Sequence, residues 1–542
     1  MPRSETTPIV LVTEFVFVKF RDAELDGICV TKFDFMKSGD SLWLHSGGKY
    51  AIIPVVAVER KDMFIGRREQ LSDLESLWRK RTSSLVACRG RRRVGKSTLF
   101  REFARRTADV YYEFEGLPPN PEKPVTNEDQ LRQFATRLAR FTNTPVQNLL
   151  SWNDAFFWLD RAIDDTKKTV VMLDEISWMG SEDSNFPGVL RNAWESLFHR
   201  HDRLVFVICG SVSAWIKKNI LGNTGFTGRF SRDYVLTELS LAECAEFWRP
   251  HVDNLAPREI FNVLSVTGGV PRYLEEIDPG LTAEENIRRL CFRKEGELYN
   301  DFDAIFNPIF GERVMKQRRI LSLLADGAMS GSEIAEKMGE DRNGRIAEML
   351  RELSEGGFVD SDPGINPETG EESRVSRYRL RDNYSRFYLK FIEPRKAQIK
   401  RGSYRFTTLS SLPEWNAVMG LAFENLIVNN AVELYPHLGV GGTTIESAAP
   451  FRSVRKDRSG HRRVCQIDLL VQTPRTVYVV EVKRKDIDGG VEKDVEEKMR
   501  LLHVRKNVSK RPVLVYDGEI SPRIEADGYF AALIPARKLL GI

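Results

Sequence analysis

Cysteine is scarce in this chain, and its spacing excludes two classes of small domain. The six cysteines among 542 residues are irregularly spaced and form no C-x-x-C pair. A disulfide-stapled secreted scaffold and a zinc ribbon both need closely spaced cysteines. We therefore expect scattered reduced thiols, which are typical of a cytoplasmic protein.

Long apolar runs and a large excess of one charge are also missing. No stretch of about 18 apolar residues exists, which predicts no membrane-spanning helix. Residues 1–8 are polar and lack the basic-then-apolar layout of a signal peptide. Lys and Arg total 81 against 77 Asp and Glu, a net charge of +4. Any nucleic-acid surface must therefore be a local patch.

The length exceeds what one hydrophobic core supports. At about 150 residues per domain it predicts three or four domains. Residues 9–60 are rich in Val, Phe and Ile and carry a Ser-Gly-Gly turn signal, which predicts a few β-strands. From residue 64 onward, strands are predicted at 84–88, 110–114, 169–173 and 204–209, and helices at 96–107, 128–142 and 153–165. This alternation predicts an α/β domain with a mainly parallel sheet.

Beyond residue 240 the pattern becomes helical and then mixed. Residues 240–300 read as helices, broken at Gly268-Gly269 and Pro271. Short helices at 315–324, 331–338 and 344–355, a turn-rich segment at 360–374 and a strand at 378–380 outline a winged helix-turn-helix. Residues 415–542 return to strands and helices. The chain as a whole is predicted to be an α/β multidomain protein.

One segment fits the phosphate-binding pattern G-x-x-x-x-G-K-[ST] completely, between a predicted strand and a predicted helix. It consists of Gly90, Arg91, Arg92, Arg93, Val94, Gly95, Lys96 and Ser97, and Thr98 follows as a further residue of the nucleotide site. The glycines let backbone N–H groups face phosphate oxygens, and the positive helix end adds to this anion site. Lys96 is expected to reach the β- and γ-phosphates of ATP, and the Ser97 hydroxyl to ligate Mg²⁺.

An acidic pair follows an apolar strand about 80 residues downstream. Asp174 is expected to hold Mg²⁺ through water, and Glu175 to orient or deprotonate the attacking water. An acidic helix cap after a strand is the alternative. Together with the P-loop, the pair favours ATP hydrolysis.

Three further polar residues are candidates for contact with the nucleotide. Ser211, after the strand at 204–209, can sense the γ-phosphate or cap a helix. Arg229 and Arg272 are candidate cationic contacts to phosphate, and each can equally belong to a structural ion pair.

These motifs occur in a recognisable order. Phe64-Ile65-Gly66-Arg67-Arg68-Glu69, the P-loop, Asp174-Glu175-Ile176-Ser177 and Gly268-Gly269-Val270-Pro271 resemble the archaeal-type P-loop ATPases, a clade of the STAND and AAA+-like ATPases, over about residues 62–395. The resemblance implies a five-stranded ATPase core, a helical lid and a winged helix. It also implies that Phe64 and Arg67 lie near the adenine and that the Gly-Val-Pro turn leads lid residues to the nucleotide.

Four charged residues near the C-terminus share a second spacing. Glu424 lies on a predicted amphipathic helix at 421–434, Asp468 in a strand at 464–471, and Glu481 in the next strand at 476–482, followed by Lys483. Asp-x₁₂-Glu-x-Lys on adjacent strands can place both carboxylates on one side of a hairpin. Two carboxylates can bind Mg²⁺, which would activate water for attack on a phosphodiester. Lys483 would position or activate that water. Glu424 would complete the metal shell or orient Lys483. A charged hairpin with a solvated lysine is the alternative.

This spacing also carries a resemblance. Gly420-Leu421-Ala422-Phe423-Glu424, Ile467-Asp468 and Glu481-Val482-Lys483 resemble the PD-(D/E)XK nuclease fold, a restriction-endonuclease-like α/β domain often appended to these ATPases. The two resemblances imply an N-terminal β-rich extension at 1–60, a P-loop ATPase core at 61–237, a helical lid at 238–308, a winged helix-turn-helix at 309–395 and a nuclease-like domain at 396–542. Such domains can keep the fold without cleaving, so cleavage and binding alone both stay open.

The predicted winged helix carries little positive charge on its recognition helix. Residues 343–355 combine two arginines with three glutamates. Four wing arginines, Arg374, Arg377, Arg379 and Arg381, are expected to grip phosphates. A solvated strand face, or packing between the ATPase and nuclease-like domains, is the alternative.

Together these features predict a cytoplasmic enzyme that binds and hydrolyses ATP with Mg²⁺ and couples nucleotide state to DNA binding and metal-dependent DNA cleavage. The alternative is a STAND-type signalling switch with slow turnover, whose C-terminal domain binds DNA or a protein without cutting. A third possibility is a mobile-element accessory factor that recruits a partner enzyme. No membrane contact is expected, and the oligomeric state stays open.

Overall fold

The computed structural model describes two compact units, Met1–Ile65 and Gly66–Ile542. The residues described are 34–38, 41–46, 49–54, 64–119, 123–211, 213–310, 313–340, 344–373, 376–440, 442–456, 459–488 and 490–542. The first unit contains an antiparallel sheet of β1 (Asp34–Ser38), β2 (Ser41–Ser46) and β3 (Lys49–Pro54). These strands fall within the region where a few strands were predicted. The rest of 1–60 lies outside the described residues.

The second unit contains a five-stranded parallel sheet. Its strands are β4 (Ser84–Arg89), β5 (Val110–Glu115), β6 (Thr169–Asp174), β7 (Leu204–Gly210) and β8 (Phe230–Val235), in the order β5-β6-β7-β4-β8. β6 and β7 are buried along their whole length, as apolar strands covered on both faces must be. The predicted strands and the α/β architecture are therefore confirmed. Because all five strands run parallel, their carboxyl ends share one edge of the sheet.

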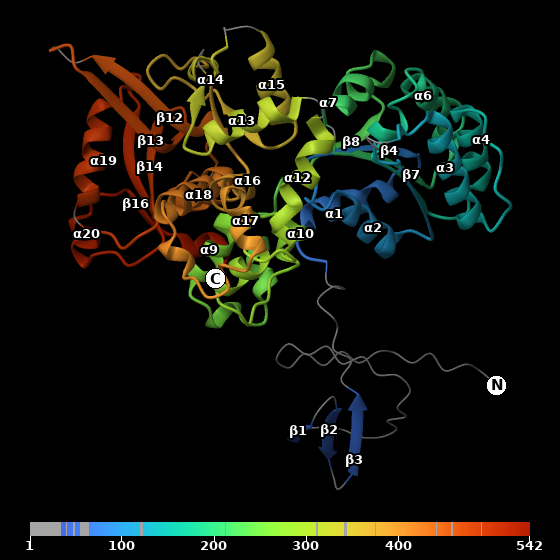
Figure 1. Cartoon of the computed structure of the whole chain (residues 1–542), viewed down its shortest axis with the longest axis horizontal. Coiled ribbons are helices and arrows are strands. Elements are labelled where there is room, and N and C mark those ends of the chain that lie inside the picture. The colour runs from blue at the N-terminus through green and yellow to red at the C-terminus, as the bar shows by residue number, and fades with distance from the viewer. Residues whose placement is uncertain are drawn as a thin grey trace. The chain divides into compact units, whose positions relative to one another are not determined.

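Helices of this domain cover the sheet (Figure 1). They include α1 (Arg68–Ser76), α2 (Lys96–Thr107), α3 (Asn127–Thr142), α4 (Trp152–Ala162), α5 (Ile176–Met179), α6 (Phe186–Ser196) and α7 (Ser213–Ile216). The α3 and α4 helices both begin at capping boxes, formed by Thr126 with Asp129 and by Ser151 with Asp154. An aromatic core that includes Phe114, with contributions from α3, α4, α6 and the strands, holds these helices on the sheet.

A helical segment follows the sheet. It consists of α8 (Leu241–Ala245), α9 (Pro257–Thr267), α10 (Pro271–Leu274), α11 (Ala283–Cys291) and α12 (Glu297–Phe310). The helices break at Gly268 and Pro271, as predicted. Gly268 has a φ of 60°, and a Cβ there would lie 2.8 Å from Glu238 Oε1, so the break needs glycine.

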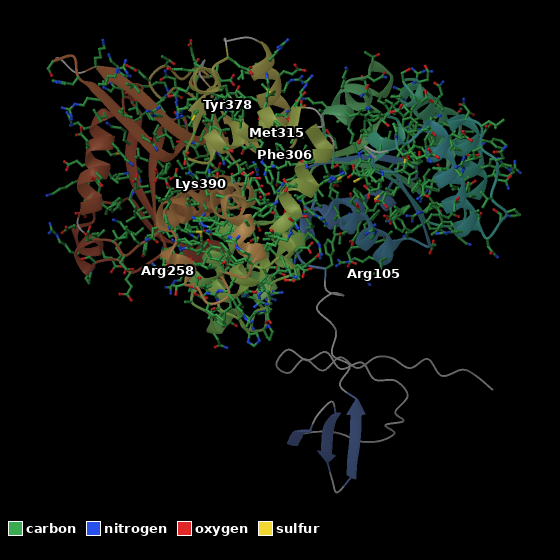
Figure 2. All side chains as sticks on the ribbon, viewed as in Figure 1. Arg105, Arg258, Phe306, Met315, Tyr378 and Lys390 are labelled. Atoms are coloured by element: carbon green, nitrogen blue, oxygen red, sulfur yellow. The ribbon has the colours of Figure 1, made fainter. Side chains whose placement is uncertain are left out.

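A small helical and sheet segment comes next. It consists of α13 (Val314–Leu324), α14 (Gly331–Met338), α15 (Gly344–Glu355) and an antiparallel sheet of β9 (Met329–Ser330), β10 (Val359–Asp362) and β11 (Arg377–Leu380), ordered β10-β11-β9. The bounds of α14 and α15 are those predicted. Phe306 of α12 is fully buried in the core beneath this segment, and Tyr378 of β11 packs against the same core (Figure 2).

The last part of the chain builds a mixed five-stranded sheet. Its strands are β12 (Ser447–Lys456), β13 (Arg462–Gln472), β14 (Thr476–Lys483), β15 (Ser509–Tyr516) and β16 (Ala532–Pro535), in sequence order across the sheet. The β12–β13 and β13–β14 pairs are antiparallel, whereas β14–β15 and β15–β16 are parallel. The α19 helix (Gly490–Leu501) crosses between the parallel strands β14 and β15.

The helix predicted at 421–434 differs in the structure. The α18 helix runs Trp415–Asn429, and a 3₁₀ segment, Ala431–Leu438, follows it. Buried side chains surround α18, so it is a core helix and not the amphipathic helix predicted. Near-complete burial removes the alternation of polar and apolar residues from which helix bounds are read.

The five cysteines among the described residues are buried and free, and Cys29 lies outside them. Among the described residues, no helix is both long enough and apolar enough to cross a bilayer.

Candidate functional site: a P-loop and a buried carboxylate pair

The P-loop forms a tight turn between β4 and α2. Gly90, Arg93 and Gly95 have positive φ of 149°, 74° and 84°, so the chain curls back before α2 begins at Lys96. A Cβ on Gly90 would lie 2.2 Å from the Leu236 carbonyl oxygen, so only glycine fits at that position. A loop curled in this way can turn successive N–H groups toward one anion.

Lys96, Ser97 and Asp174 gather at this loop. Lys96 is buried, and its Nζ donates to the carbonyl oxygens of Gly90 and Arg91, both at 3.0 Å. Ser97 Oγ donates to Asp174 Oδ2 at 2.5 Å, which brings the end of β6 to the start of α2. A hydroxyl and a carboxylate are the oxygen ligands that Mg²⁺ accepts beside nucleotide phosphates, so the residues present fit the ion.

Glu175 and Ser211 face each other across neighbouring strand ends. Glu175 has a left-handed φ of 48°. Its Oε2 accepts from the Ser211 backbone N at 3.0 Å and from Ser211 Oγ at 2.8 Å. Glu175 makes no side-chain cap bond to α5, so the acidic-cap alternative is not what the structure shows. The Ser211 hydroxyl donates to this carboxylate beside the P-loop.

Arg91 points out of the P-loop into a buried ion pair. Its NH1 donates to Asp382 Oδ1 at 2.6 Å, and the two side chains are 5% and 0% exposed. The guanidinium also lies over the Phe358 ring, 5.4 Å from its centroid. Burial acts to lower the pKa of Arg91, but the Asp382 carboxylate outweighs burial and the pKa is raised. The Arg91 guanidinium therefore stays charged.

Arg92 and Arg93 also reach beyond the sheet. The Arg92 guanidinium donates to Ser211 Oγ and to the Ala304 carbonyl oxygen of α12, both at 3.4 Å. Arg93 pairs with Asp301 of α12 at 2.9 Å. The variable positions of the P-loop thus contact α12 as well as the segment around Asp382.

Arg67 lies against the P-loop, although not as a free cation. Its backbone N donates to Glu243 Oε1 at 2.6 Å, and its guanidinium donates to the carbonyl oxygens of Val94, at 3.1 Å, and of Thr237. Burial lowers its pKa. Phe64 belongs to the first unit and is half-buried, so its place near the adenine stays a prediction.

Arg272 lies next to the P-loop within a set of ion pairs. Its backbone N lies 3.5 Å from the Arg93 carbonyl oxygen. Its guanidinium pairs with Glu276 at 2.8 Å and with Glu297 at 3.1 Å. The ion-pair alternative therefore describes Arg272, and its contact with phosphate stays a prediction.

Arg229 requires a correction, because it is not at the nucleotide. It forms a surface ion pair with Glu195. It precedes β8, and β8 runs parallel to β4 with Phe230 beside Leu85. Arg229 therefore stands at the amino end of β8, whereas the P-loop follows the carboxyl end of β4. The structural alternative is the correct one.

Asp468 stands at an irregularity in β13. Ala449 pairs with Leu470 but Phe451 pairs with Ile467, so β13 carries one extra residue at this point. Such a bulge re-aims a side chain. Asp468 Oδ2 accepts from the Val482 backbone N at 2.8 Å, which fixes the carboxylate against β14.

Glu481 is held by two lysines. Only 2% of its side chain is exposed, and Lys483 Nζ reaches Oε1 while Lys498 Nζ reaches Oε2, each at 2.5 Å. Lys483 and Glu481 share a face, as predicted. Lys498 comes from α19 and was missed, because no local spacing links it to the Glu-x-Lys motif. Only the crossover of α19 beside β13 brings it there.

Acidity at this second site is shifted by burial. Burial raises the pKa of Asp468 to about 6, and the neighbouring Glu481 carboxylate adds to the effect. Burial, followed by the Asp468 charge, raises the pKa of Glu424 to about 7. Burial acts to lower the pKa of Lys483, but Glu481 outweighs it and the net pKa is raised. Lys483 is therefore an ammonium near neutral pH, which favours positioning of water over deprotonation.

The predicted three-carboxylate metal shell is not formed. Within the described ranges, no three His, Cys, Asp or Glu side chains gather closely enough to hold a metal ion together. The charges of Asp468 and Glu481 still act on Glu424, so the three carboxylates share one region of the domain. Two buried carboxylates remain. Mg²⁺ is usually held by one or two carboxylates plus substrate phosphates, so Asp468 and Glu481 still fit such an ion.

The wing arginines are also corrected. Arg379 is buried and bonds Asp360, Asp362, Asn425 and Asn429, so it cannot grip phosphate. Its guanidinium is buried because it faces Asn425 and Asn429 of α18. Arg377 pairs with Glu333, Arg381 with Asp360, and Arg374 lies outside the described residues. Packing between segments is the interpretation that fits Arg379.

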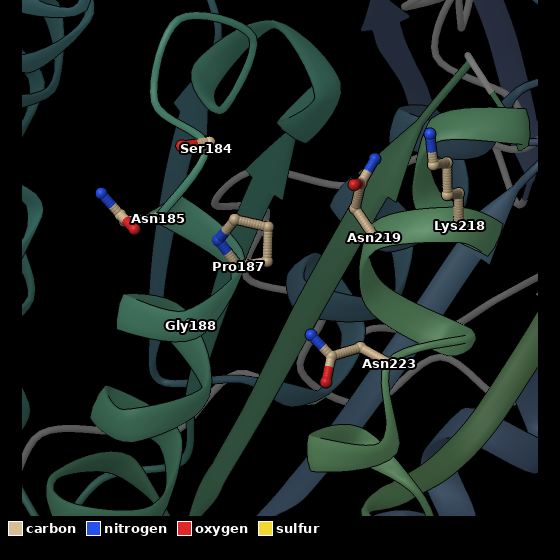
Figure 3. Close-up of a pocket in the computed structure, with 7 residues that line it drawn as sticks. All are labelled: Ser184, Asn185, Pro187, Gly188, Lys218, Asn219 and Asn223. Carbon is tan, nitrogen blue, oxygen red and sulfur yellow. The ribbon is translucent and has the colours of Figure 1, made fainter.

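A polar pocket of about 390 Å³ lies elsewhere on the ATPase domain (Figure 3). It opens between the start of α6 and the π-helical turn Lys217–Leu221. Its lining consists of Ser184, Asn185, Pro187, Gly188, Lys218, Asn219 and Asn223. None of the predicted site residues lines it.

Residues 64–277 match the family model described as an ATPase domain predominantly from Archaea. The match spans the P-loop, the Asp174-Glu175 pair and the Gly-Val-Pro turn. This part of the chain is therefore an archaeal-type, nucleotide-binding P-loop ATPase domain.

Several known proteins are similar to the chain. An uncharacterized protein of Methanocaldococcus jannaschii is 22% identical over 446 residues, which cover 81% of this chain and 92% of that protein. An uncharacterized ATP-binding protein of the same organism is 44% identical over 41 residues, 8% of this chain and 70% of that protein. A Walker-type ATPase of Pyrococcus abyssi has a TM-score of 0.46 at 17% identity, covering 61% of this chain and 97% of that structure.

Proposed function

We propose that this protein hydrolyses ATP and uses its nucleotide state to control DNA binding and metal-dependent DNA cleavage by its C-terminal part. In this proposal α8–α12 act as a helical lid, α13–β11 as a winged helix, and α18–β16 as a PD-(D/E)XK nuclease-like domain. The mixed sheet, with α19 crossing between β14 and β15 and Asp468 beside Glu481, supports the last assignment.

At the nucleotide site, the P-loop residues would bind and orient the phosphates. Mg²⁺ held by Ser97 and Asp174 would neutralise charge on the phosphates. Lys96 would exchange the two loop carbonyls for phosphate oxygens, gaining a charged partner. Glu175, released from Ser211, would accept a proton from the attacking water.

A continuous polar chain supports the coupling. It begins with the buried pair of Arg91 and Asp382. The next residue, Asn383, accepts at Oδ1 from Asn425 Nδ2 at 2.9 Å. Asn425 lies on α18, directly after Glu424. Because every member is buried, a shift of the P-loop upon ATP binding would be costly unless α18 followed.

At the C-terminal site, this chain's residues would hold a scissile phosphate and a water. Mg²⁺ bound by Asp468 and Glu481 would supply Lewis acidity toward the phosphodiester. Lys483, as an ammonium, would donate to water or phosphate oxygen, and Lys498 would hold Glu481 in place. The bulge at Asp468 fixes the carboxylate through Val482.

The direct test is cleavage of plasmid DNA with Mg²⁺ or Mn²⁺. We expect Asp468→Asn and Glu481→Gln to abolish cleavage, since each removes a metal-binding charge. The exposed Glu525→Gln, with the same charge change, serves as the matched control and keeps wild-type cleavage. Absence of cleavage by the wild type under every metal and nucleotide condition would overturn the nuclease assignment.

A slow switch is the second candidate, and the burial of the Arg91–Asp382 pair favours it. Leaving one charge of a buried ion pair without its partner costs about 3–5 kcal/mol. A transition that separates Arg91 from Asp382 would therefore be infrequent. Single-turnover hydrolysis with retained ADP would support this candidate. Steady turnover stimulated by DNA would support the first.

A further inference from the structure

The predicted recognition helix offers little net positive charge to the DNA of the proposed function, because residues 343–355 carry two arginines and three glutamates. The α15 helix has its glutamates engaged, with Glu348 and Glu352 on Arg313 and Glu355 on Lys217. A strongly basic surface is found instead on the hairpin of β12 and β13. Figure 1 shows the free end of this hairpin at the upper left of the view.

Part of the hairpin is a two-stranded ribbon. Only Leu469–Gln472 of β13 pair with β14, whereas residues 462–467 pair with β12 alone. The ribbon therefore comprises residues 451–456 and 462–467. Six residues per strand span about 20 Å.

Cross-strand partners define one outer face of the ribbon. Three directly opposed pairs alternate onto it: Lys456 with Arg462, Val454 with Val464, and Arg452 with Gln466. All six residues are exposed, and Val454 and Val464 keep 51% and 46% of their surface. The opposite face carries Cys465, which is buried beside α19 and whose Sγ donates to the Lys498 carbonyl oxygen.

Among the described residues, the two cations at the free end of the outer face have no compensating acid. Lys456 and Arg462 form no ion pair with any residue in the described ranges, and Arg452 has Glu333 at 3.5 Å. The ribbon residues 451–456 and 462–467 include no acid. Like charges directly opposed across a strand pair destabilise it, so Lys456 beside Arg462 costs the fold stability. An anionic partner would reverse that cost.

We propose that this outer face docks double-stranded B-form DNA, an inference that rests on the proposed DNA function and names its surface. The B-DNA major groove admits a two-stranded β-ribbon, whereas the deep, narrow major groove of A-form RNA does not. Lys456, Arg462 and Arg452 contact backbone phosphates, and the exposed valines lie against the groove. Gln466 offers an amide to a base edge.

The position of the ribbon links docking to the carboxylate pair. One strand, β13, carries both Arg462 and Asp468, which lies at the bulge, and six residues or about 20 Å separate them. That distance corresponds to about six base-pair steps at 3.4 Å each. DNA held by the ribbon therefore lies within reach of Asp468 and Glu481.

The test is equilibrium binding of the full chain to a labelled 25-base-pair DNA duplex in EDTA, which prevents cleavage. For Lys456→Gln with Arg462→Gln we expect at least tenfold weaker binding at 0.1 M salt. We also expect a salt-dependence slope lower by about 2, since each phosphate contact contributes about 0.9. The control is Arg79→Gln with Lys80→Gln, which removes the same charge from two exposed residues and leaves binding unchanged. Lys456→Arg with Arg462→Lys, which keeps both charges, is expected to retain binding.

The outcomes separate this inference from the proposed function. Wild-type binding that the Gln variants do not weaken overturns the ribbon surface alone. No wild-type binding overturns both the surface and the DNA function. Equal affinity for an A-form RNA duplex, lost to the same extent in the variants, overturns the assignment to B-form DNA. All three double variants are expected to keep wild-type ATP turnover and thermal midpoint, because the four side chains changed in them are exposed.

Discussion

Glu175 is the proposed general base, so the rate of ATP hydrolysis is expected to depend on this residue more than on any other. Its carboxylate accepts two hydrogen bonds from Ser211 and has no other described partner for its side chain. Removing its basicity is expected to lower kcat for ATP by about 100-fold or more, because general bases contribute about 10²–10⁴-fold. Nucleotide affinity is expected to stay within a few fold, since Lys96 and the loop remain.

The corresponding measurement compares Glu175→Gln with Glu182→Gln, an exposed glutamate on the same stretch of chain. Steady-state turnover and nucleotide binding are measured for both. The role assigned to Glu175 is wrong if its variant turns over ATP at the rate of the Glu182 variant.

The buried carboxylates predict a pH dependence of metal binding. A pKa of about 6 for Asp468 and about 7 for Glu424 means that protons compete with metal near neutrality. Metal affinity is therefore expected to rise with pH, whereas the contribution of these carboxyls to folding stability is expected to fall. A carboxyl with a raised folded pKa holds its proton more tightly when folded, so its contribution to the free energy of unfolding falls as pH rises from about 4 to about 7.

Titration of Mn²⁺ into the protein at pH 5.5 and pH 7.5 tests this directly. The expected affinity at pH 5.5 is roughly fivefold or more below that at pH 7.5. Asp468→Asn, measured in parallel, isolates this site from the P-loop site. Identical wild-type affinity at the two pH values would contradict the assigned acidities.

Among elements, the segment that begins at α16 (Asn383–Phe387) links the P-loop to α18. Asp382 caps α16 through the Ser385 backbone N, at 2.9 Å, while it pairs with Arg91. Leaving a buried arginine without its partner costs about 3–5 kcal/mol. Asp382→Asn is therefore expected to lower the thermal midpoint clearly.

Glu195→Gln provides the contrast, because Glu195 pairs with Arg229 at the surface. Exposed ion pairs contribute about 0–1 kcal/mol, so little change in midpoint is expected. Calorimetry of both variants tests the comparison. Equal midpoints would show that the Arg91–Asp382 pair does not hold the two segments together.

Helices marked by a sequence motif, a capping box or a clear apolar periodicity could be located from the sequence. The α2 helix begins and ends where the P-loop motif and its apolar periodicity place it. The Ser330 capping box with Glu333 marks the start of α14. The edge strand β8 could not be located, because its partly exposed residues lack the continuous apolar run of β6.

The errors at the candidate sites have a common physical cause. Whether an arginine faces phosphate or a carboxylate depends on strand ends and sheet order, which sequence spacing does not contain. Arg229 and Arg379 were misplaced for that reason, and Lys498 was missed because α19 must first cross back over the sheet. The P-loop residues could be identified because their chemistry is confined to eight consecutive positions.

At the scale of the whole molecule, the account requires that the ATPase and C-terminal sites communicate. The Arg91–Asp382 pair and the Asn383–Asn425 bond provide a physical connection. Lys96→Ala is expected to remove the response of the C-terminal site to ATP while leaving Asp468, Glu481 and Lys483 intact. Lys80→Ala, at an exposed lysine, is the control and keeps the wild-type response.

The measurement that tests this coupling most directly is the rate of plasmid cleavage with and without ATP, in the wild type and in Lys96→Ala. The account predicts that ATP changes the wild-type rate and that the Lys96→Ala rate stays the same with or without ATP. Cleavage by the wild type at one rate regardless of ATP, matched by Lys96→Ala, would contradict it.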